Sequence, residues 1–280
     1  MIIDFHTHIF PSFFRNERNL LFDEEQAFQL LYKSAKAKLV GKKELIRNMD
    51  EEGVHKSVVF GFPWQNVDNF RRHNDYIIES VHHYPDRLIG FCCFSPLSPQ
   101  APEEAKRCLE SGLSGIGELA VYNSDLLSKE VSISKDIMDI CTYYDVPLML
   151  HTNEPVGHQY PGKTPINLGE IYGFVKKYPS NRIVLAHWGG GLFFYMLMKR
   201  EVRKVLRNVW VDTAASPFLY DPDIYRLAGQ IIGFDRILFG SDYPLIKPSR
   251  YFKEIATSNI SAQSNENISG INAAHLLRLQ

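Results

Sequence analysis

Short apolar runs, rich in β-branched and aromatic residues, alternate along the 280-residue chain with amphipathic stretches of helical period. Each run is continuously apolar, which is typical of strands in a parallel sheet that helices cover. Eight such runs occur, at residues 1–8, 56–62, 87–95, 114–122, 146–153, 182–189, 209–216 and 236–244. This order of strand then helix, repeated eight times, places the chain in the α/β class.

Helix start and stop signals separate these runs. The pattern at 68–85 stops at a proline, and the one at 102–112 begins with proline, carries acids in its first turn and ends at glycine. Residues 134–145 and 165–179 follow the same pattern. The connections between strands are therefore helical.

Eight such units in 280 residues favour a single closed (β/α)8 TIM barrel that occupies residues 1–280 as one domain. An open doubly wound sheet is the alternative. It would need a glycine-rich phosphate turn after its first strand, and the sequence has no GxGxxG there.

Two connections are longer than a barrel needs. Residues 9–55 form an insertion after the first strand, with expected helices at 23–39 and 41–53. Residues 153–165 follow the fifth strand, and 268–280 are expected to form a closing helix. Long loops after barrel strands usually build and cover the active site, so we expect the site at the mouth formed by the carboxyl ends of the strands.

Composition limits the partners and the compartment. Hydrophobic residues make up 45% and charged residues 22%, and the formal net charge of −1 gives no electrostatic reason to expect nucleic acid or an anionic membrane as a partner. No signal peptide or spanning apolar run is recognisable, which favours a cytoplasmic protein. The apolar segment 190–199 predicts a buried helix, with a homodimer face as the alternative. Reduced thiols are expected, because no CxxC pair occurs among Cys92, Cys93, Cys108 and Cys141.

Metal-ligand residue types lie at the ends of the apolar runs. His6 and His8 are two residues apart on the first strand, so both side chains are expected on one face. His151, His187 and Asp242 end the fifth, sixth and eighth runs. Buried imidazoles and carboxylates without partners are costly, and one divalent cation would satisfy several of them together. Such a set suits zinc, and also manganese, iron or cobalt, with an open position left for water.

These motifs, read in order as HTH, HTNEP, AHWGGG and GSDYP, resemble the amidohydrolase superfamily. The similarity is to its amidohydrolase-related branch, which includes aminocarboxymuconate semialdehyde and γ-resorcylate decarboxylases and various hydrolases. The resemblance implies that His6, His8 and His151 are metal ligands. It implies that Asp242 is a ligand, a general base, or both. His187 would lie beside the metal, where it binds a second ion or contacts the attacking water and the intermediate.

Two carboxylates admit more than one role. Glu118 ends the fourth strand, where the sequence is similar to TatD-like deoxyribonucleases. A bridging Glu118 would make His187 a ligand and give two ions; otherwise one ion is expected, and we favour one. Asp4 is expected on the face of the histidine pair, either to orient a ligand histidine or as a polar plug in the barrel floor.

Substrate contacts are expected from loop residues. His158, Tyr160 and Lys163 lie in the loop after the fifth strand and could hold a carboxylate or phenolate. The alternative is that this loop supplies only structural turns. Trp64, after the second strand, is a candidate wall of the pocket, with core packing as the alternative.

The main function expected from these residues is hydrolysis of a small amide, lactone or ester. A bound metal lowers the pKa of water from about 15.7 to about 7, Asp242 would accept its proton, and His187 would stabilise the oxyanion. The alternative is a non-oxidative decarboxylase that uses the same ligands on a small-molecule substrate. A TatD-like phosphoesterase is disfavoured because no basic surface signal is present.

Overall fold

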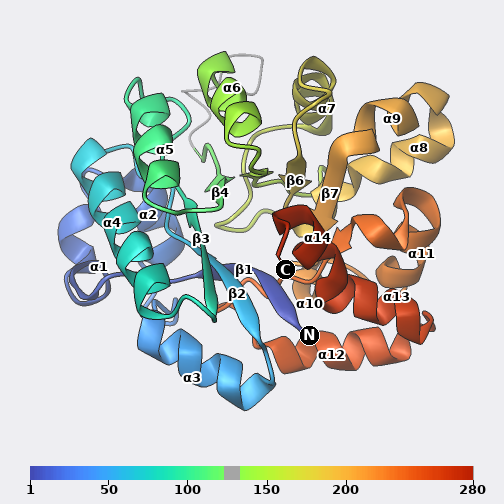
Figure 1. Ribbon diagram of the computed structural model, residues 1–280, viewed down its shortest axis with the longest axis horizontal. Helices are drawn as coiled ribbons and strands as arrows, with labels where there is room; N and C mark the ends of the chain where they lie inside the picture. Colours follow the sequence, from blue (N-terminus) through green and yellow to red (C-terminus); the bar gives the residue numbers. More distant parts are fainter. Residues whose placement is uncertain (123–132, 280) are drawn as a thin grey trace.

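The computed structural model describes residues 1–122 and 133–279. The strands in these residues form one sheet in the order β1 to β8, and each neighbouring pair is parallel (Figure 1). The strands are β1 (Ile3–His8), β2 (Lys56–Phe60), β3 (Leu88–Cys92), β4 (Gly115–Leu119), β5 (Leu148–Leu150), β6 (Ile183–Leu185), β7 (Val209–Asp212) and β8 (Ile237–Leu238).

The first and last strands close the barrel. The amide of Asp242 donates to the carbonyl of His6 at 2.9 Å, and the amide of His8 donates to the carbonyl of Tyr243 at 2.8 Å. Thr7 and Tyr243 also form a parallel bridge. The predicted (β/α)8 TIM barrel is therefore confirmed, and the open sheet is excluded.

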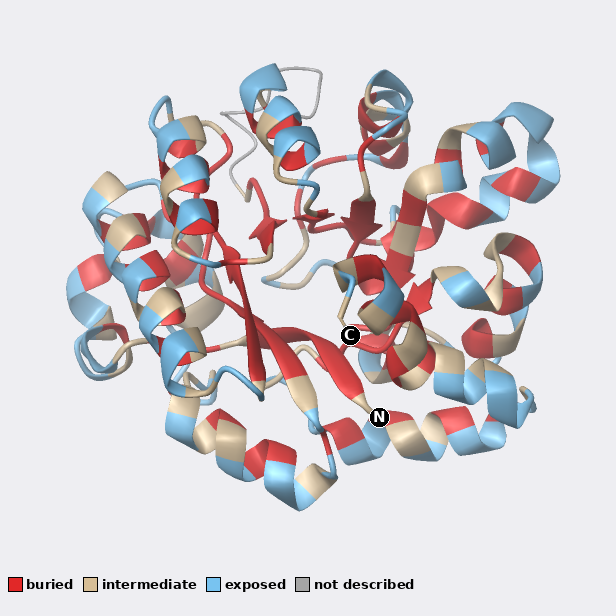
Figure 2. Cartoon of the chain, viewed as in Figure 1, coloured by how far each residue is buried: buried red, intermediate tan, exposed pale blue. Residues whose placement is uncertain are grey.

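Helices surround the strands and bury only their inner faces (Figure 2). None of those in the described ranges is both long and apolar enough to span a lipid bilayer. The outer helices are α3 (Lys42–Glu52), α4 (Val67–His83), α5 (Ala101–Glu110), α6 (Lys135–Tyr143), α7 (Leu168–Lys177), α9 (Arg200–Val205), α11 (Ile224–Ile232) and α12 (Pro248–Thr257). Shorter segments are α1 (Ser12–Asn16), η1 (Arg18–Leu21), α2 (Gln26–Tyr32), η3 (His187–Phe194), α8 (Tyr195–Met198), η4 (Leu206–Asn208), α10 (Ser216–Leu219), η5 (Phe234–Arg236), α13 (Ala262–Glu266), η6 (Asn267–Ile271) and α14 (Asn272–Leu277).

A second apolar cluster fills the inside of the barrel, apart from the core between strands and helices. It includes Phe5, Phe60 and Phe91, and α14 adds Ala273 and Leu276 at the amino-terminal end of the strands. The floor of the barrel is thus packed shut, and only the opposite end can admit a ligand. The expected closing helix 268–280 is divided between η6 and α14, and residue 280 lies outside the described residues.

Two expected helices are wrong in extent. The helix expected at 23–39 is only α2, because residues 33–36 are all exposed and have no apolar face to bury. The segment 190–199 bends between η3 and α8 instead of forming one buried helix, and Leu197 and Met198 are 69% and 71% exposed in the single chain. A homodimer stays a prediction.

A buried histidine ties the insertion to the barrel. The Trp64 indole N–H donates to His73 Nδ1 at 2.9 Å, and His73 Nε2–H donates to the carbonyl of Ile9 at 2.7 Å. The rings of Phe10 and Phe14 lie 4.9 and 5.4 Å from the imidazole. Both ring nitrogens are satisfied only in the neutral tautomer, and burial lowers the pKa of His73 to about 3.

His73 should make the protein less stable in mild acid. The unfolded state takes up a proton near pH 6.5, whereas folded His73 does so only near pH 3, so stability falls as the pH drops below about 6.5. We expect this residue alone to lower the free energy of unfolding by about 2 kcal/mol between about pH 7.5 and pH 5. Chemical unfolding of the wild type and of His73→Gln at both pH values measures the difference. Exposed His83→Gln is the control, and an unchanged pH dependence in His73→Gln would contradict the assignment.

Candidate metal centre

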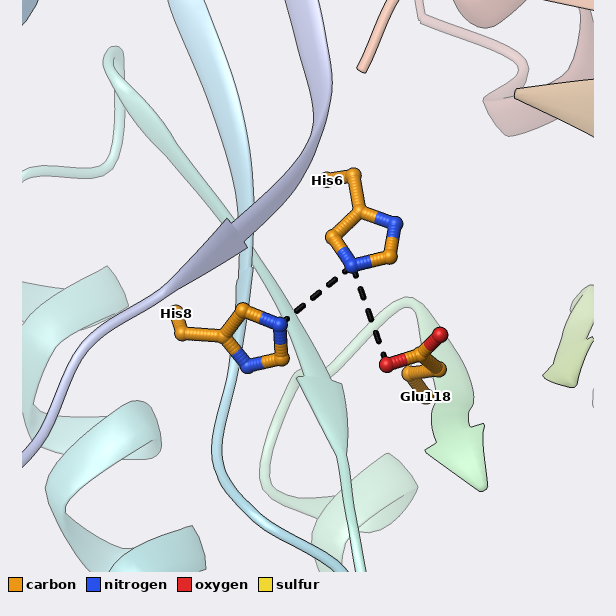
Figure 3. Close-up of side chains that lie close together, drawn as sticks. All are labelled: His6, His8 and Glu118. Carbon is orange, nitrogen blue, oxygen red and sulfur yellow. Dashed lines mark hydrogen bonds and ion pairs between the residues drawn. The ribbon is translucent and has the colours of Figure 1, made fainter. Parts of the chain in front are cut away.

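Six potential ligand side chains meet at the carboxyl ends of the strands. His6 and His8 lie on β1 and Glu118 on β4, as Figure 3 shows. His151, His187 and Asp242 follow β5, β6 and β8. In three overlapping triads, one donor atom from each residue lies within 4.8 Å of the others. The expected convergence of these residues is thus present in the structure.

A β-bulge in β1 and another in β4 direct potential ligand side chains into the mouth of the barrel. The pairing of β1 with β2 gains one residue between Asp4 and Thr7, and the pairing of β4 with β5 gains one between Ile116 and Leu119. Such a bulge redirects the side chains beside it. In β4 it includes Gly117 at φ 133°, where an added Cβ would lie 2.4 Å from the carbonyl oxygen of Met149. Only glycine fits there, and Glu118 is presented as a result.

The imidazoles are held in one orientation by backbone carbonyls. His8 Nδ1 lies 3.2 Å from the carbonyl of Gly61, and His187 Nδ1 lies 3.0 Å from that of Ala214. A carbonyl can only accept, so both Nδ1 atoms carry hydrogen. In the neutral form of each ring, the Nε2 lone pair then faces the cluster, which is the arrangement that metal-binding histidines need.

Asp212, at the end of β7, connects three strands beneath the cluster. Its Oδ2 accepts from His6 Nδ1 at 2.8 Å, and its Oδ1 accepts from the amides of His187 and Ala214 at 2.8 and 3.0 Å. Sequence reasoning missed this residue. A carboxylate at the end of the seventh apolar run was the signal that could have identified it.

Four donor atoms are spaced as the edges of a coordination shell. His6 Nε2 lies 3.3 Å from His8 Nε2, and Asp242 Oδ1 lies 3.4 Å from His8 Nε2 and 3.7 Å from His6 Nε2. Glu118 Oε2 lies 3.7 Å from His6 Nε2. Ligands at about 2.1 Å from an ion in tetrahedral geometry are about 3.4 Å apart. The spacing of these four donor atoms therefore suits a divalent cation bound between them.

His151 leaves one nitrogen without a partner. Its Nδ1 lies 2.9 Å from Glu118 Oε1, while its Nε2 is buried with no hydrogen-bond partner among the described residues. Such an atom is costly unless an ion or water binds it. His187 Nε2 lies 3.4 Å from the same Oε1, so Glu118 touches two triads through its two oxygens. This geometry suits either one ion or two, and one ion stays our prediction.

Several carboxylates surround His6 and change the pKa values in the cluster. Burial lowers the pKa of His6, but the carboxylates of Asp212 and Glu118 outweigh it and raise the pKa to about 10. Burial raises the pKa of Glu118, yet the nearby His151 and His6 hold it well below its usual range. The pKa of Asp242 is likewise lowered, through His8 and His6. A buried site that retains carboxylates and attracts a proton also attracts a metal cation, which competes with that proton.

The loop that carries His187 has unusual backbone geometry. Residues 187–191 all have positive φ, and three of these five are glycines. At Gly190 an added Cβ would lie 2.4 Å from the carbonyl oxygen of Asn153. The HWGGG motif therefore lets the loop after β6 lie directly on the loop after β5, which brings His187 beside His151 at 4.8 Å between ring centroids.

A cavity of about 490 Å³ opens above the cluster. Its floor includes His8, Glu118, His151, His187 and Asp242. Its walls are mostly aromatic and aliphatic, which suits a small organic ligand. The wall and rim residues include Tyr32, Lys36, Lys38, Phe62, Tyr122, His158, Tyr160, Phe218, Leu219 and Leu245.

Three expectations about single residues need correction. Trp64 does not line the cavity; it is fully buried and packs 5.0 Å behind the ring of Phe62. Lys163 also lies outside the lining and pairs with Glu154 at 3.1 Å. Of the two roles left open for Asp4, the first is not supported, because its carboxylate bonds to no imidazole among the described residues.

The Asp4 carboxylate binds the amide and hydroxyl of Ser241 at 2.8 and 2.5 Å. The physical reason is the bulge after Asp4, which breaks the two-residue alternation assumed for this strand. His158 and Tyr160 do line the cavity, as expected.

Comparison with known proteins identifies relatives along the whole chain. The family model described as amidohydrolase matches residues 3–279. A γ-resorcylate decarboxylase from Polaromonas sp. (strain JS666 / ATCC BAA-500) is 24% identical over 84% of this chain and 86% of that protein. Another, from Rhizobium sp. (strain MTP-10005), is 25% identical over 76% of this chain and 77% of that protein.

Solved structures share the fold. The 5-carboxyvanillate decarboxylase from Sphingomonas paucimobilis superposes with a TM-score of 0.79 at 17% identity, covering 100% of this chain and 99% of that one. The dihydroxybenzoic acid decarboxylase from Polaromonas sp. JS666, with bound manganese and the inhibitor 2-nitroresorcinol, superposes with a TM-score of 0.73 at 20% identity, covering 99% and 97%.

These relatives overturn the expected main function. Hydrolysis of an amide, lactone or ester is wrong as the main interpretation, because the similar proteins are named as decarboxylases. The expectation failed because the same ligands serve both reactions. Manganese in the related structures likewise gives no support to zinc in particular.

Proposed function

The chain belongs to the amidohydrolase family, and on that basis we propose that it is a metal-dependent decarboxylase of carboxylated phenols. The proposal is supported most by one observation: a cluster of metal-ligand atoms 3.3–3.7 Å apart forms the floor of an aromatic-walled cavity. The similarity to γ-resorcylate decarboxylases over 84% of the chain supports the choice of reaction.

Residues of β1 and of the segments after β5 and β8 would hold the ion. His6, His8 and Asp242 supply closely spaced donors, and His151 supplies an unpaired buried nitrogen. A bound divalent cation, for which we favour manganese and keep zinc, iron or cobalt as alternatives, would supply a Lewis acid toward carboxylate and phenol oxygens.

The chain's own side chains position and enclose the substrate. Phe62 and Tyr122 present parallel rings with centroids 6.1 Å apart on one wall, and Phe218 and Leu219 lie on the wall formed after β7. Apolar walls exclude water and keep the ring's carboxylate directed toward the floor. Released carbon dioxide leaves through the same mouth, because the opposite end of the barrel is packed shut.

The reaction needs a proton at the ring carbon. The bond from this carbon to the carboxylate breaks, its electron pair stays on the ring carbon, and that carbon takes a proton as carbon dioxide leaves. His187 is the proposed donor through Nε2, because its Nδ1–H is held by Ala214. Burial lowers the pKa of His187, but the Glu118 carboxylate outweighs this and raises it, which favours the charged imidazole. Asp242, whose pKa is lowered, stays a carboxylate and suits a ligand.

The proposal predicts stoichiometric release of carbon dioxide. Manganese-loaded protein should convert 2,6-dihydroxybenzoate or 5-carboxyvanillate to the phenolic product that has lost one carboxylate, with one carbon dioxide per product formed. Headspace carbon dioxide and chromatography of the phenol measure this balance. A chelator should abolish the activity, and added manganese should restore it. Metal-loaded protein that releases no carbon dioxide from a panel of hydroxybenzoates would refute the proposal.

A further inference from the structure

Two tyrosines from separate parts of the chain face the same side of the cavity. Tyr32 is the last residue of α2 in the insertion after β1, and Tyr122 follows β4. Both line the cavity. Phe62 lies between them, with its ring centroid 6.0 Å from that of Tyr32 and 6.1 Å from that of Tyr122.

Both phenols lie close to the cluster on the floor. The ring of Tyr122 is 5.6 Å from that of His151. Burial raises the pKa of Tyr32, and the nearby charges of Asp242 and Glu118 raise it further. Burial and the charge of Glu118 likewise raise the pKa of Tyr122. Each tyrosine therefore presents a neutral O–H group to the cavity.

Neither hydroxyl has a hydrogen-bond partner within residues 1–122 and 133–279. The other cavity tyrosine differs in this respect, because the hydroxyl of Tyr160 donates to Glu154 at 2.9 Å. A neutral donor that faces an enclosed cavity gains a hydrogen bond only when a ligand or water supplies an acceptor.

The segments after β7 and β8 contribute no side-chain donor to the cavity. The residues after β7 and β8 that line the cavity above Asp242 are all apolar: Ala215, Phe218, Leu219, Pro244 and Leu245. Lys36 and Lys38 are exposed at the rim. His158 also lines the cavity but is exposed to solvent. An aromatic ring bound against these apolar residues would therefore meet the two enclosed, unpaired hydroxyl donors on the side of Tyr32 and Tyr122.

We propose that Tyr32 and Tyr122 donate hydrogen bonds to a second ring oxygen of the substrate and so select benzoates with oxygen substituents on both sides of the carboxylate. This inference rests on the proposed function. The carboxylate and one neighbouring oxygen face the floor, and the other neighbouring oxygen meets the two phenols. The tyrosines are specificity residues and take no part in the bond-breaking step.

A pair of unreactive ligands tests this selectivity by binding alone. 2-Nitroresorcinol carries two hydroxyls beside its nitro group, and 2-nitrophenol carries one. Calorimetric titration of manganese-loaded protein should give a preference of about tenfold for 2-nitroresorcinol. Tyr32→Phe and Tyr122→Phe should each reduce this preference about threefold, and the double variant should nearly abolish it. Affinity for 2-nitrophenol should be unchanged in all of them.

Controls separate this inference from the proposed function. Tyr144→Phe alters a phenol outside the cavity that contacts Glu110, and should keep the full preference. Equal preference in the wild type and the double variant would overturn the inference, as would failure of the wild type to bind 2-nitroresorcinol. Neither result depends on turnover, whereas absence of carbon dioxide release with normal ligand selectivity would count against the decarboxylase alone.

Discussion

His8→Ala is expected to lower bound manganese from about one ion per chain to less than a tenth of that, and to lower kcat/KM by at least about a thousandfold. His8 Nε2 lies 3.3 Å from His6 Nε2 and 3.4 Å from Asp242 Oδ1, so its loss opens one side of the coordination shell. Elemental analysis of protein purified without chelator, together with the decarboxylation assay, measures both effects.

Two further variants make this result specific. His83→Ala removes an exposed histidine at the end of α4 and should change neither quantity. Glu118→Ala should leave about one ion per chain if the centre holds a single ion. Two ions in the wild type that fall to one in this variant would contradict our preference and make Glu118 a bridge. Normal metal content in His8→Ala would contradict the ligand assignment itself.

His187→Gln is expected to lower kcat by about a hundredfold to a thousandfold while metal content stays unchanged. Glutamine keeps an amide group near the position of the imidazole but cannot deliver a proton. The backbone amide of His187 still binds Asp212, so the loop after β6 should keep its place. Single-turnover measurement at saturating substrate separates the chemical step from binding.

The outcome discriminates between two roles for this histidine. A loss of metal that parallels the loss of activity would show that His187 is a ligand of a second ion rather than the proton donor. An unchanged kcat would reject both roles. Ala214→Gly keeps the carbonyl that accepts from His187 Nδ1 and should retain most of the activity.

The barrel and most of its donors could be predicted because both follow from local patterns. Continuous apolar runs give parallel strands, and polar residues at their carboxyl ends must meet at one mouth. His6, His8, His151, His187 and Asp242 were all found in this way, and the structure brings them together.

Departures from regular geometry could not be predicted. A two-residue alternation placed Asp4 beside the histidines, but one extra residue in β1 sends its carboxylate to Ser241. Asp212 connects β1, β6 and β7 only once the strands are adjacent in space. Tyr32 reaches the cavity through the packing of an insertion, which no local pattern encodes. The largest error was the prediction of hydrolysis, because the reaction type depends on substrate contacts and not on the metal ligands alone.

The seam where the barrel closes has a consequence for biosynthesis. His6 and His8 leave the ribosome long before Asp242, and the hydrogen bond from the Asp242 amide to the His6 carbonyl forms only when the segment after β8 docks against β1. A nascent chain, or one whose carboxyl-terminal part is unfolded, therefore lacks the Asp242 carboxylate in the coordination shell. Binding of the ion with the full set of ligands therefore requires that the chain is made at least through Asp242 and that the barrel has closed.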